Sequence, residues 1–177
     1  MCTANRCRSP LAAALLHKVL AERGVSAEVD AFGLLEQGLP AAAETVAVAA
    51  TRGLDLSDHR SRRLDAAVVS HADFVLAMER RHVREIVAAD PAAWPRTFTL
   101  KEIVRRGQRI GGRKSGEALT TWIARAHEGR RSRDLLGASE LDDVADPVGS
   151  PLGEHEDLAL ELEDLTRELA ELIVPTD

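Results

Sequence analysis

The segment CTANRCRSP at residues 2–10 organises the interpretation of this sequence. Its last two residues, Ser9 and Pro10, give the start signal of a helix, because a serine cap is often followed by proline at the first helical position. Apolar residues then recur at the spacing of one helix face: Leu11, Leu15, Leu16, Val19 and Leu20. Gly24 follows where a helix favours glycine after its last turn. The segment therefore predicts a loop that runs directly into a helix.

Beyond this helix, strand-like and helix-like patterns alternate along the chain. Strands are predicted over residues 27–32, 73–78 and 96–100, and helices over 41–52, 80–89, 117–127 and the leucine-rich stretch 158–172. Glycine and basic residues dominate 105–116, which predicts a loop or an insertion. The alternation predicts an α/β fold, a three-layer α/β/α sandwich with a parallel sheet. We expect a single domain over residues 1–177.

Composition excludes several classes of protein. Of the 177 residues, 45% are hydrophobic and 29% are charged, which is typical of a globular chain. No apolar run approaches the ~18 residues of a spanning helix, and no signal-peptide pattern is found, so we expect a cytoplasmic protein without a membrane partner. Two cysteines are too few for a disulfide framework or a cysteine-rich zinc site. Aromatic residues, at 3%, argue against a nucleic-acid partner, and the sequence leaves the oligomeric state open.

Charge is distributed unevenly along the chain. Residues 101–133 carry ten basic and three acidic side chains, whereas residues 134–177 carry one basic and fourteen acidic ones. Blocks of this kind are typical of solvated surfaces, and the two could lie against each other. The alternative is that the basic stretch docks an acidic partner.

The first residues combine groups that phosphate chemistry requires. Cys2 and Arg8 lie on either side of the loop, immediately before the predicted helix. The N–H groups at a helix N-terminus form an anion site, and a thiol beside them and a cation ionises more easily. An arginine fork holds two phosphoryl oxygens at once. These features predict a phosphoryl-transfer site with a protein nucleophile, whereas the simpler alternative is an ordinary terminal thiol and a solvated charge.

The pattern Cys-Thr-x-Asn-x-Cys-Arg-Ser-Pro resembles the signature of the low-molecular-weight protein tyrosine phosphatases. Similar stretches recur at residues 33–34, 53–62 and 73–78, and Asp146 with Pro147 comes just before the last predicted helix, as the acid loop of that family does. Residues 101–140 are the least similar, which marks them as a basic variable segment. The resemblance implies a fold like that of phosphotyrosine protein phosphatase I, with its first strand absent from this chain.

The resemblance also implies a two-step reaction and a role for each site residue. Cys2 would take the phosphoryl group as a phosphocysteine, Arg8 would hold its oxygens, and Asp146 would serve as general acid and then as base. The implied set comprises catalytic Cys2, Arg8 and Asp146, substrate-binding Thr3, Ala4, Asn5, Arg6, Cys7 and Arg8, and loop-supporting Asn5, Ser9 and His59. No metal or organic cofactor is implied, and the substrate would be a phosphorylated protein or a small phosphate ester.

Three of these residues have other interpretations from the sequence alone. Asn5 could be a turn former, Ser9 a helix cap and His59 an ordinary surface or core histidine. Asp142 and Asp143 compete with Asp146 for the role of the acid. We favour Asp146 because Pro147 follows it and restricts its backbone.

Cys7 matches a second cysteine of the family that forms a disulfide with the nucleophile. The resemblance therefore implies a Cys2–Cys7 bond that protects the reactive sulfur from irreversible oxidation. We expect reversible oxidative inactivation.

The chain departs from the family at its start, because only Met1 precedes Cys2 where relatives carry an apolar strand. A sheet that lacks an interior strand leaves backbone groups unpaired. Many members of the family have valine just before the cysteine, and a GTG valine codon can serve as a start read as methionine. We therefore expect the start at Met1 to lie too far downstream, and an upstream in-frame stretch to encode about four to six apolar strand residues. A stop codon directly upstream would instead indicate a catalytically poor remnant.

Substrate-facing positions also differ. Val148 stands where the family often has tyrosine, and Ala31 and Phe32 replace small and hydroxyl residues, which puts tyrosine specificity in doubt. Trp94 and Trp122 are interpreted as packing residues rather than walls of the crevice.

Three functions compete on this basis. The first is a cysteine-dependent phosphate-monoester hydrolase, in particular a protein tyrosine phosphatase. The second is an arsenate reductase that uses a low-molecular-weight thiol, since a thioredoxin-linked version needs a downstream cysteine pair that this chain lacks. The third is a truncated, non-catalytic phosphate-binding module.

Overall fold

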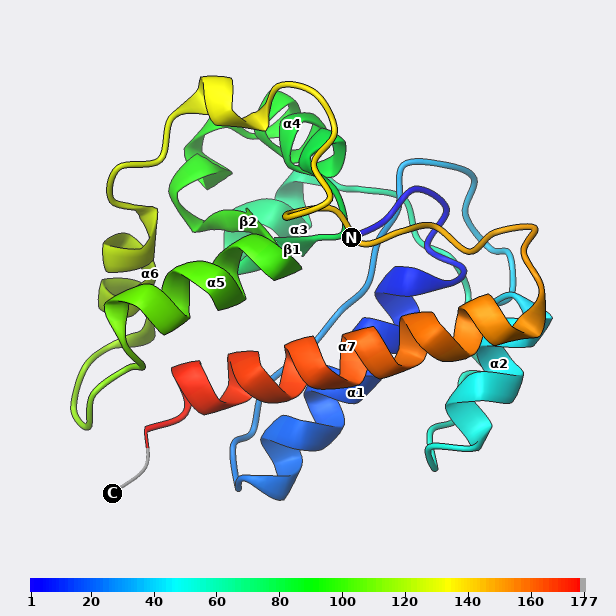
Figure 1. Cartoon of the computed structure of the whole chain (residues 1–177). Helices are drawn as coiled ribbons and strands as arrows, with labels where there is room; N and C mark the ends of the chain where they lie inside the picture. The colour runs from blue at the N-terminus through cyan, green and yellow to red at the C-terminus, as the bar shows by residue number, and fades with distance from the viewer. Residues whose placement is uncertain (176–177) are drawn as a thin grey trace. The chain divides into compact units, whose positions relative to one another are not determined.

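The predicted start signal produces helix α1, Arg8–Glu22, in a computed structural model that describes residues 1–175 (Figure 1). The contacts of the chain divide it into two units. The first comprises Met1–Arg63 and Ala145–Arg167, and the second comprises Leu64–Val144 and the residues from Glu168 onward. The expectation of a single domain stays a prediction.

The first unit contains α1, helix α2, Ala43–Ala50, and the larger part of helix α7, Leu152–Ile173. Most of the leucines that predicted α1 and α7 are buried, among them Leu11, Leu15, Leu16, Leu20, Leu158 and Leu162. Arg52 at the end of α2 forms an ion pair with Glu163 of α7 at 3.2 Å. The predicted helices over 41–52 and 158–172 are thus confirmed, with shifted ends.

The strand predicted over residues 27–32 is wrong, because the structure has no strand there. The Cys2 N–H donates to the Phe32 carbonyl at 3.1 Å. A strand requires a repeated ladder of bonds to a neighbouring segment, and this single bond does not make one. Isolated bridges join Gly33 to Arg63 and Pro40 to Arg60 instead.

The second unit contains the parallel sheet, formed by β1, Val75–Ala77, and β2, Thr97–Thr99 (Figure 1). Val75 pairs with Thr97 and Ala77 with Thr99. Parallel neighbours need a crossover, which here is helix α4, Arg80–Ala89, and the 3₁₀ turn η1, Pro91–Arg96. A short helix, α3, Ala66–His71, precedes β1. The predicted α/β class and the strands near 73–78 and 96–100 are confirmed.

The loop predicted over 105–116 is wrong for its first half, because helix α5 spans Leu100–Ile110. Thr99 caps this helix by accepting a hydrogen bond from the Glu102 N–H at 3.1 Å. Gly107 lies inside α5 where a Cβ would come within 2.7 Å of Leu172 and 2.9 Å of Trp122. The glycine therefore permits close packing, and the fully buried Trp122 is the packing residue that was predicted.

Helix α6, Leu119–His127, and the 3₁₀ turn η2, Ser132–Leu135, complete the second unit. Several arginines of the basic stretch bind backbone carbonyls at helix ends in this unit. Arg106 donates to Ala126 and Glu128, Arg113 to Ile173, and Arg125 to Ile110, over 2.5–2.7 Å. Part of the basic surplus is therefore used inside the unit rather than displayed to a partner.

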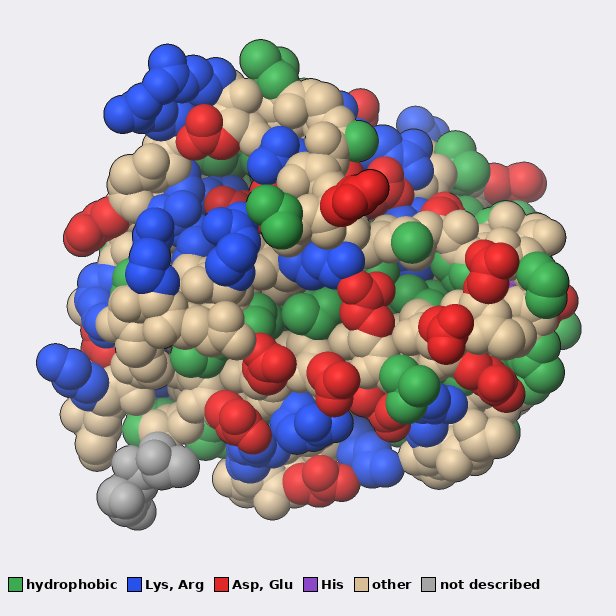
Figure 2. Space-filling view, viewed as in Figure 1, with side chains coloured by type: hydrophobic (Ala, Val, Ile, Leu, Met, Phe, Trp, Pro, Cys, Tyr) green, Lys and Arg blue, Asp and Glu red, His purple; other side chains and the backbone are tan. Residues whose placement is uncertain are grey.

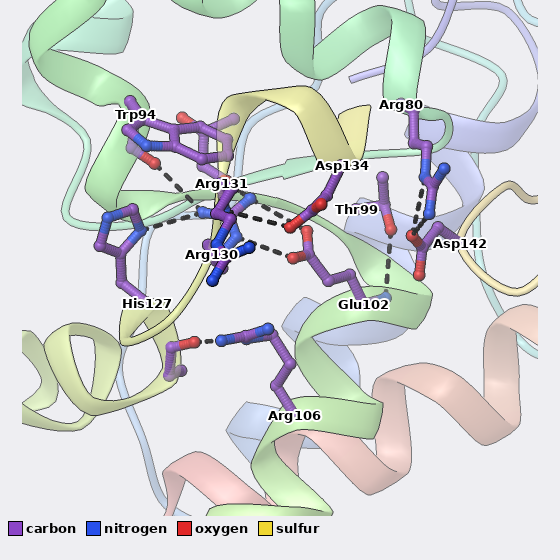
Figure 3. A network of polar contacts seen from close by, with 12 residues as sticks. Arg80, Trp94, Thr99, Glu102, Arg106, His127, Arg130, Arg131, Asp134 and Asp142 are labelled. Atoms are coloured by element: carbon purple, nitrogen blue, oxygen red, sulfur yellow. Dashed lines mark hydrogen bonds and ion pairs between the residues drawn. The ribbon is translucent and has the colours of Figure 1, made fainter. Parts of the chain in front are cut away.

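Arg130 lies at the centre of a buried network in the second unit (Figure 3). Its guanidinium stacks on Trp94 and Phe98, 4.0 and 3.9 Å from the ring centroids, and pairs with both oxygens of Glu102. Its side chain is only 2% exposed. The planar fork thus joins two aromatic rings, a carboxylate and the Thr97 carbonyl.

Acidic side chains gather along the exposed face of α7 (Figure 2). Exposed members are Glu154, Glu156, Asp157, Asp164 and Glu171. Within residues 1–175, no helix combines the length and apolar character that crossing a membrane requires.

Candidate active site

The loop before α1 carries Cys2 at its start, and the side chain of this residue is almost fully buried. Its Sγ lies 3.0 Å from the hydroxyl oxygen of Ser9 in the first turn of α1. Ser9 also accepts a hydrogen bond from the Asn5 side-chain amide at 2.9 Å. Because a serine has only one proton to donate, the Ser9 hydroxyl can donate either to the sulfur or to the Phe32 carbonyl, 3.3 Å away. A thiolate at Cys2 would be the stronger acceptor.

Asn5 holds the loop in a bent conformation. Its φ of 53° lies in the left-handed region, and no other non-glycine residue among those described shares this property. Its side-chain oxygen accepts from the Arg62 N–H at 2.8 Å, and its backbone carbonyl lies 2.7 Å from Nε2 of His59. Because a carbonyl only accepts, Nε2 of His59 must carry the proton of this bond. The structure thus brings together the three residues predicted to support the loop, Asn5, Ser9 and His59.

The carbonyl oxygens of the loop point away from its interior. The Thr3 carbonyl accepts from Leu34 at 2.6 Å, and the Arg6 carbonyl accepts from Ala42 at 2.8 Å. In a trans peptide, the C=O of one residue and the N–H of the next point in opposite directions, and the described chain has no cis peptide. The N–H groups that follow the outward carbonyls of Thr3, Asn5 and Arg6 therefore face inward. Successive inward N–H groups at a helix N-terminus form an anion-binding nest.

Gly33 allows the loop to lie against a neighbouring segment. A Cβ on this residue would come within 2.7 Å of the Asn5 nitrogen and 2.8 Å of the Thr3 oxygen. Both atoms belong to the backbone of the loop, so a side chain at position 33 would have to displace it. Gly33 is therefore a part of the site that sequence reasoning did not single out.

Arg8 and Asp146 meet in the same unit, although they are 138 positions apart in the sequence. The guanidinium Nη2 of Arg8 lies 2.5 Å from Oδ2 of Asp146 and 3.5 Å from the Thr3 hydroxyl. The other two candidate acids are engaged elsewhere, in the second unit. Asp142 pairs with Arg80 and Arg105, and Asp143 accepts from the N–H of Arg80 and of Ser139. Asp146 is thus the candidate acid that contacts Arg8.

Cys7 lies in a polar pocket of the first unit. Its Sγ accepts a hydrogen bond from the Thr45 hydroxyl at 3.0 Å and lies 3.6 Å from Nδ1 of His155. The pKa of the Cys7 thiol is raised to about 11, chiefly by burial; the Thr45 hydrogen bond opposes the shift and the charge of Cys2 adds to it. Thr45 and His155 were missed by sequence reasoning, because neither is near the loop in the sequence nor part of a motif.

Two further features of the first unit are the side chain of Arg6 and a separate groove. Arg6 donates to the Pro40 carbonyl at 2.8 Å, so its side chain turns toward that segment. A groove of about 480 Å³ runs along the outer side of α1 toward His59 and Arg62, and its lining does not include Cys2, Arg8 or Asp146. Val148, the residue at the family's tyrosine position, is largely exposed. Within residues 1–175, no group of three metal-ligating side chains gathers.

Comparisons with known proteins identify the family of this chain. The family model described as low molecular weight phosphotyrosine protein phosphatase matches residues 1–110. A probable low molecular weight protein-tyrosine-phosphatase of Ralstonia nicotianae, EpsP, is 40% identical over 103 residues, which cover 58% of this chain and 69% of the relative. The protein-arginine-phosphatase of Geobacillus stearothermophilus is 32% identical over 172 residues, covering 97% of this chain and 91% of the relative. A crystal structure of the low molecular weight protein tyrosine phosphatase from T. tengcongensis matches with a TM-score of 0.72 and 31% identity, over 96% of this chain and 94% of the other.

Proposed function

Because this chain belongs to the low molecular weight phosphotyrosine protein phosphatase family and is a hydrolase of that type, we propose that it dephosphorylates phosphorylated proteins through a phosphocysteine on Cys2. The observation that carries the proposal is the convergence of three groups in one unit. The sulfur of Cys2 lies beside Ser9 at the helix start, the loop N–H groups face inward, and Arg8 contacts Asp146.

In the first step, the Cys2 sulfur attacks phosphorus and the bond from phosphorus to the leaving group breaks. Arg8 and the inward N–H groups bind the phosphoryl oxygens, whose charge grows in the transition state. Asp146, in its protonated form, donates a proton to the leaving group. The leaving group departs neutral, and the phosphoryl group stays on sulfur.

In the second step, water attacks the phosphocysteine. The carboxylate of Asp146 takes a proton from this water, the sulfur–phosphorus bond breaks and inorganic phosphate forms. The Ser9 hydroxyl, 3.0 Å from the sulfur, stabilises the thiolate that leaves. Besides the attacking water, both steps use side chains and N–H groups of this chain.

Two protein substrates are supported by different observations. Relatives named as tyrosine phosphatases support phosphotyrosine, and they match 58% and 55% of this chain. Relatives named as protein-arginine-phosphatases match nearly the whole chain, which favours phosphoarginine as a second candidate. The exposed Val148 supplies no aromatic ring to stack on a phosphotyrosine.

We also propose that a Cys2–Cys7 disulfide inactivates the enzyme reversibly. Both cysteines are free thiols in the structure, and the charge of Cys2 influences the pKa of Cys7, which places the two sulfurs in one electrostatic environment. Peroxide treatment followed by intact-mass measurement should show the loss of two hydrogens and recovery of activity with a reductant. Stepwise addition of oxygen atoms without that loss would contradict this pairing.

The central test is hydrolysis of para-nitrophenyl phosphate by the wild type and by Cys2→Ser and His17→Asn. Cys2→Ser should abolish turnover, because a serine hydroxyl here is a far weaker nucleophile, whereas the exposed His17 is a matched control that should keep full activity. Phosphotyrosine and phosphoarginine peptides, assayed side by side, then decide the substrate. Arsenate turnover with a low-molecular-weight thiol but no ester hydrolysis would identify a reductase, and silence on every substrate would indicate a phosphate-binding module. A cytoplasmic location stays a prediction from the sequence.

A further inference from the structure

The pocket around Cys7 contains a histidine that the phosphatase reaction does not use. His155 is the fourth residue of α7, is 2% exposed, and lies with Nδ1 3.6 Å from the Cys7 sulfur. Thr45 of α2 reaches the same sulfur from the other side at 3.0 Å. The side chains of Thr45 and His155 thus reach the buried thiol of Cys7 from two other segments of the chain.

The direction of these hydrogen bonds follows from the available protons. The Thr45 hydroxyl donates to the sulfur, so the sulfur acts as its acceptor. A neutral thiol has one proton left to donate, and a neutral imidazole offers one nitrogen that accepts. When His155 carries its proton on Nε2, the Cys7 proton and Nδ1 of His155 are matched as donor and acceptor.

Cys7 cannot act as an efficient nucleophile without help. With a pKa of about 11, only about one Cys7 in ten thousand is a thiolate at pH 7. Disulfide exchange and the closure of a sulfenic acid both require the thiolate. Any reaction of Cys7 at neutral pH thus needs a base within reach.

We propose that His155 is the base that activates Cys7 as the resolving thiol, with Thr45 stabilising the thiolate that forms. This inference rests on the reversible oxidation included in the proposed function and assigns it a new residue. A peroxide first oxidises Cys2 to a sulfenic acid and releases water. His155 Nδ1 then takes the Cys7 proton, the Cys7 sulfur attacks the sulfur of Cys2, and the sulfur–oxygen bond breaks. The departing hydroxide takes the proton back from the imidazolium, so that the balance is one disulfide and one water.

Other charged groups act on Cys7, and none of them replaces the base. Cys2 and Asp146 raise its pKa and Arg8 lowers it. Arg8 cannot accept a proton, and Asp146 is bonded to Arg8. His155 is thus the group in direct contact with Cys7 that can both accept and return a proton.

The test measures disulfide closure after one equivalent of hydrogen peroxide, by intact mass, with dimedone trapping the sulfenic acid, between pH 7 and 9. His155→Phe should close at least tenfold more slowly than wild type at pH 7 and should accumulate the dimedone adduct. Its rate should rise nearly tenfold per pH unit, because it depends on hydroxide to form the thiolate, while the wild-type rate rises much less. His155→Gln should behave in the same way, and His17→Asn should match wild type.

Closure by His155→Phe at the wild-type rate, or with the wild-type pH slope, would overturn the proposal. The same conclusion would follow if the wild type formed no disulfide. If His155→Phe loses its helical circular dichroism, His155→Gln, which preserves polarity and helix propensity, decides the question. Phosphate-ester hydrolysis by reduced His155→Phe should stay within about twofold of wild type. An enzyme that hydrolyses no ester but closes with His155-dependent kinetics would refute the proposed function and leave this inference standing.

Discussion

The carboxylate of Asp146 contacts the guanidinium of Arg8 at 2.5 Å, although the acid is 35% exposed and the arginine only 1%. A partly exposed carboxylate thus contacts a buried cation. The phosphoryl oxygens of a substrate require the same guanidinium. Phosphate must therefore compete with Asp146, and the acid released from Arg8 becomes available to the leaving group.

Asp146→Asn should separate these two roles. We expect kcat to fall by about 100-fold or more, because the general acid is lost. Inorganic phosphate should inhibit the variant more strongly, since a neutral amide competes less well for Arg8. Steady-state kinetics with phosphate as inhibitor measures both effects, with Glu156→Gln on the exposed face of α7 as control. Weaker inhibition by phosphate would contradict the competition.

Arg8→Lys should lower kcat/KM by about 100-fold, because an ammonium cannot bind two phosphoryl oxygens in one plane. The matched control is Arg23→Lys at the other end of α1, because this arginine has no role in the proposed reaction. Kinetics on a chromogenic phosphate ester measures the change, with circular dichroism to verify folding. Equal activities of the two variants would show that the planar fork is not used.

Gly33→Ala should damage the loop, because its Cβ would come within 2.7–2.8 Å of backbone atoms of Asn5 and Thr3. We expect a loss of activity of at least tenfold and weaker binding of phosphate, from a methyl group that touches no substrate. Gly153→Ala is the control, since a Cβ there meets nothing within 4 Å and favours the helix. An active Gly33→Ala variant would mean that the loop moves aside without cost.

The Cys7 thiol should make stability depend on alkaline pH. Its pKa is about 11 in the folded chain, compared with an ordinary value of 9.0, so the folded state holds the proton more tightly. The stability that the protonated Cys7 thiol contributes to the folded state is fully present below pH 9 and is lost as the pH rises through 11. It amounts to about 3 kcal/mol at most. Urea unfolding under reducing conditions should show a smaller alkaline loss for Cys7→Ala, and the chain has no tyrosine that would add its own titration.

Arg130 should be the most sensitive charge in the second unit. Replacing it with methionine leaves Glu102 buried without its partner, which costs about 3–5 kcal/mol. The double variant Arg130→Met with Glu102→Leu should recover much of that loss. The exposed Arg131 is the control, and Arg131→Ala should change the free energy of unfolding by less than about 0.5 kcal/mol. Thermal or urea unfolding measures the series, and additive effects in the double variant would rule out a coupled pair.

Local patterns predicted the part of the site that is local. The start of α1 could be read from Ser9 and Pro10, and the loop that ends there gathers Cys2 and Arg8 within nine positions. The pairing of Arg8 with Asp146 spans 138 positions, and only the resemblance to a family suggested it. Thr45 and His155 carried no signal, because packing brings them to Cys7 from distant segments.

Two errors in the fold have physical causes. The strand at 27–32 fails because β propensity does not create a strand without a ladder partner. Helix α5 was missed because glycine and arginine suggested a loop, although Thr99 and Glu102 have the spacing of a capping box. In that helix, Arg106 donates to two backbone carbonyls and Gly107 leaves room for Leu172 and Trp122, so both residue types have structural uses.

The contact that Gly107 makes with Leu172 and Trp122 has a bearing on how mutational scans of this protein should be interpreted. A saturation library would find side chains at position 107 unfavourable, because Leu172 and the buried Trp122 would have to shift. Protein abundance measured together with turnover would distinguish a packing position from a reacting residue. Replacements at Gly107 would lower the amount of folded protein, whereas replacements at a reacting group would leave a normal amount of inactive protein.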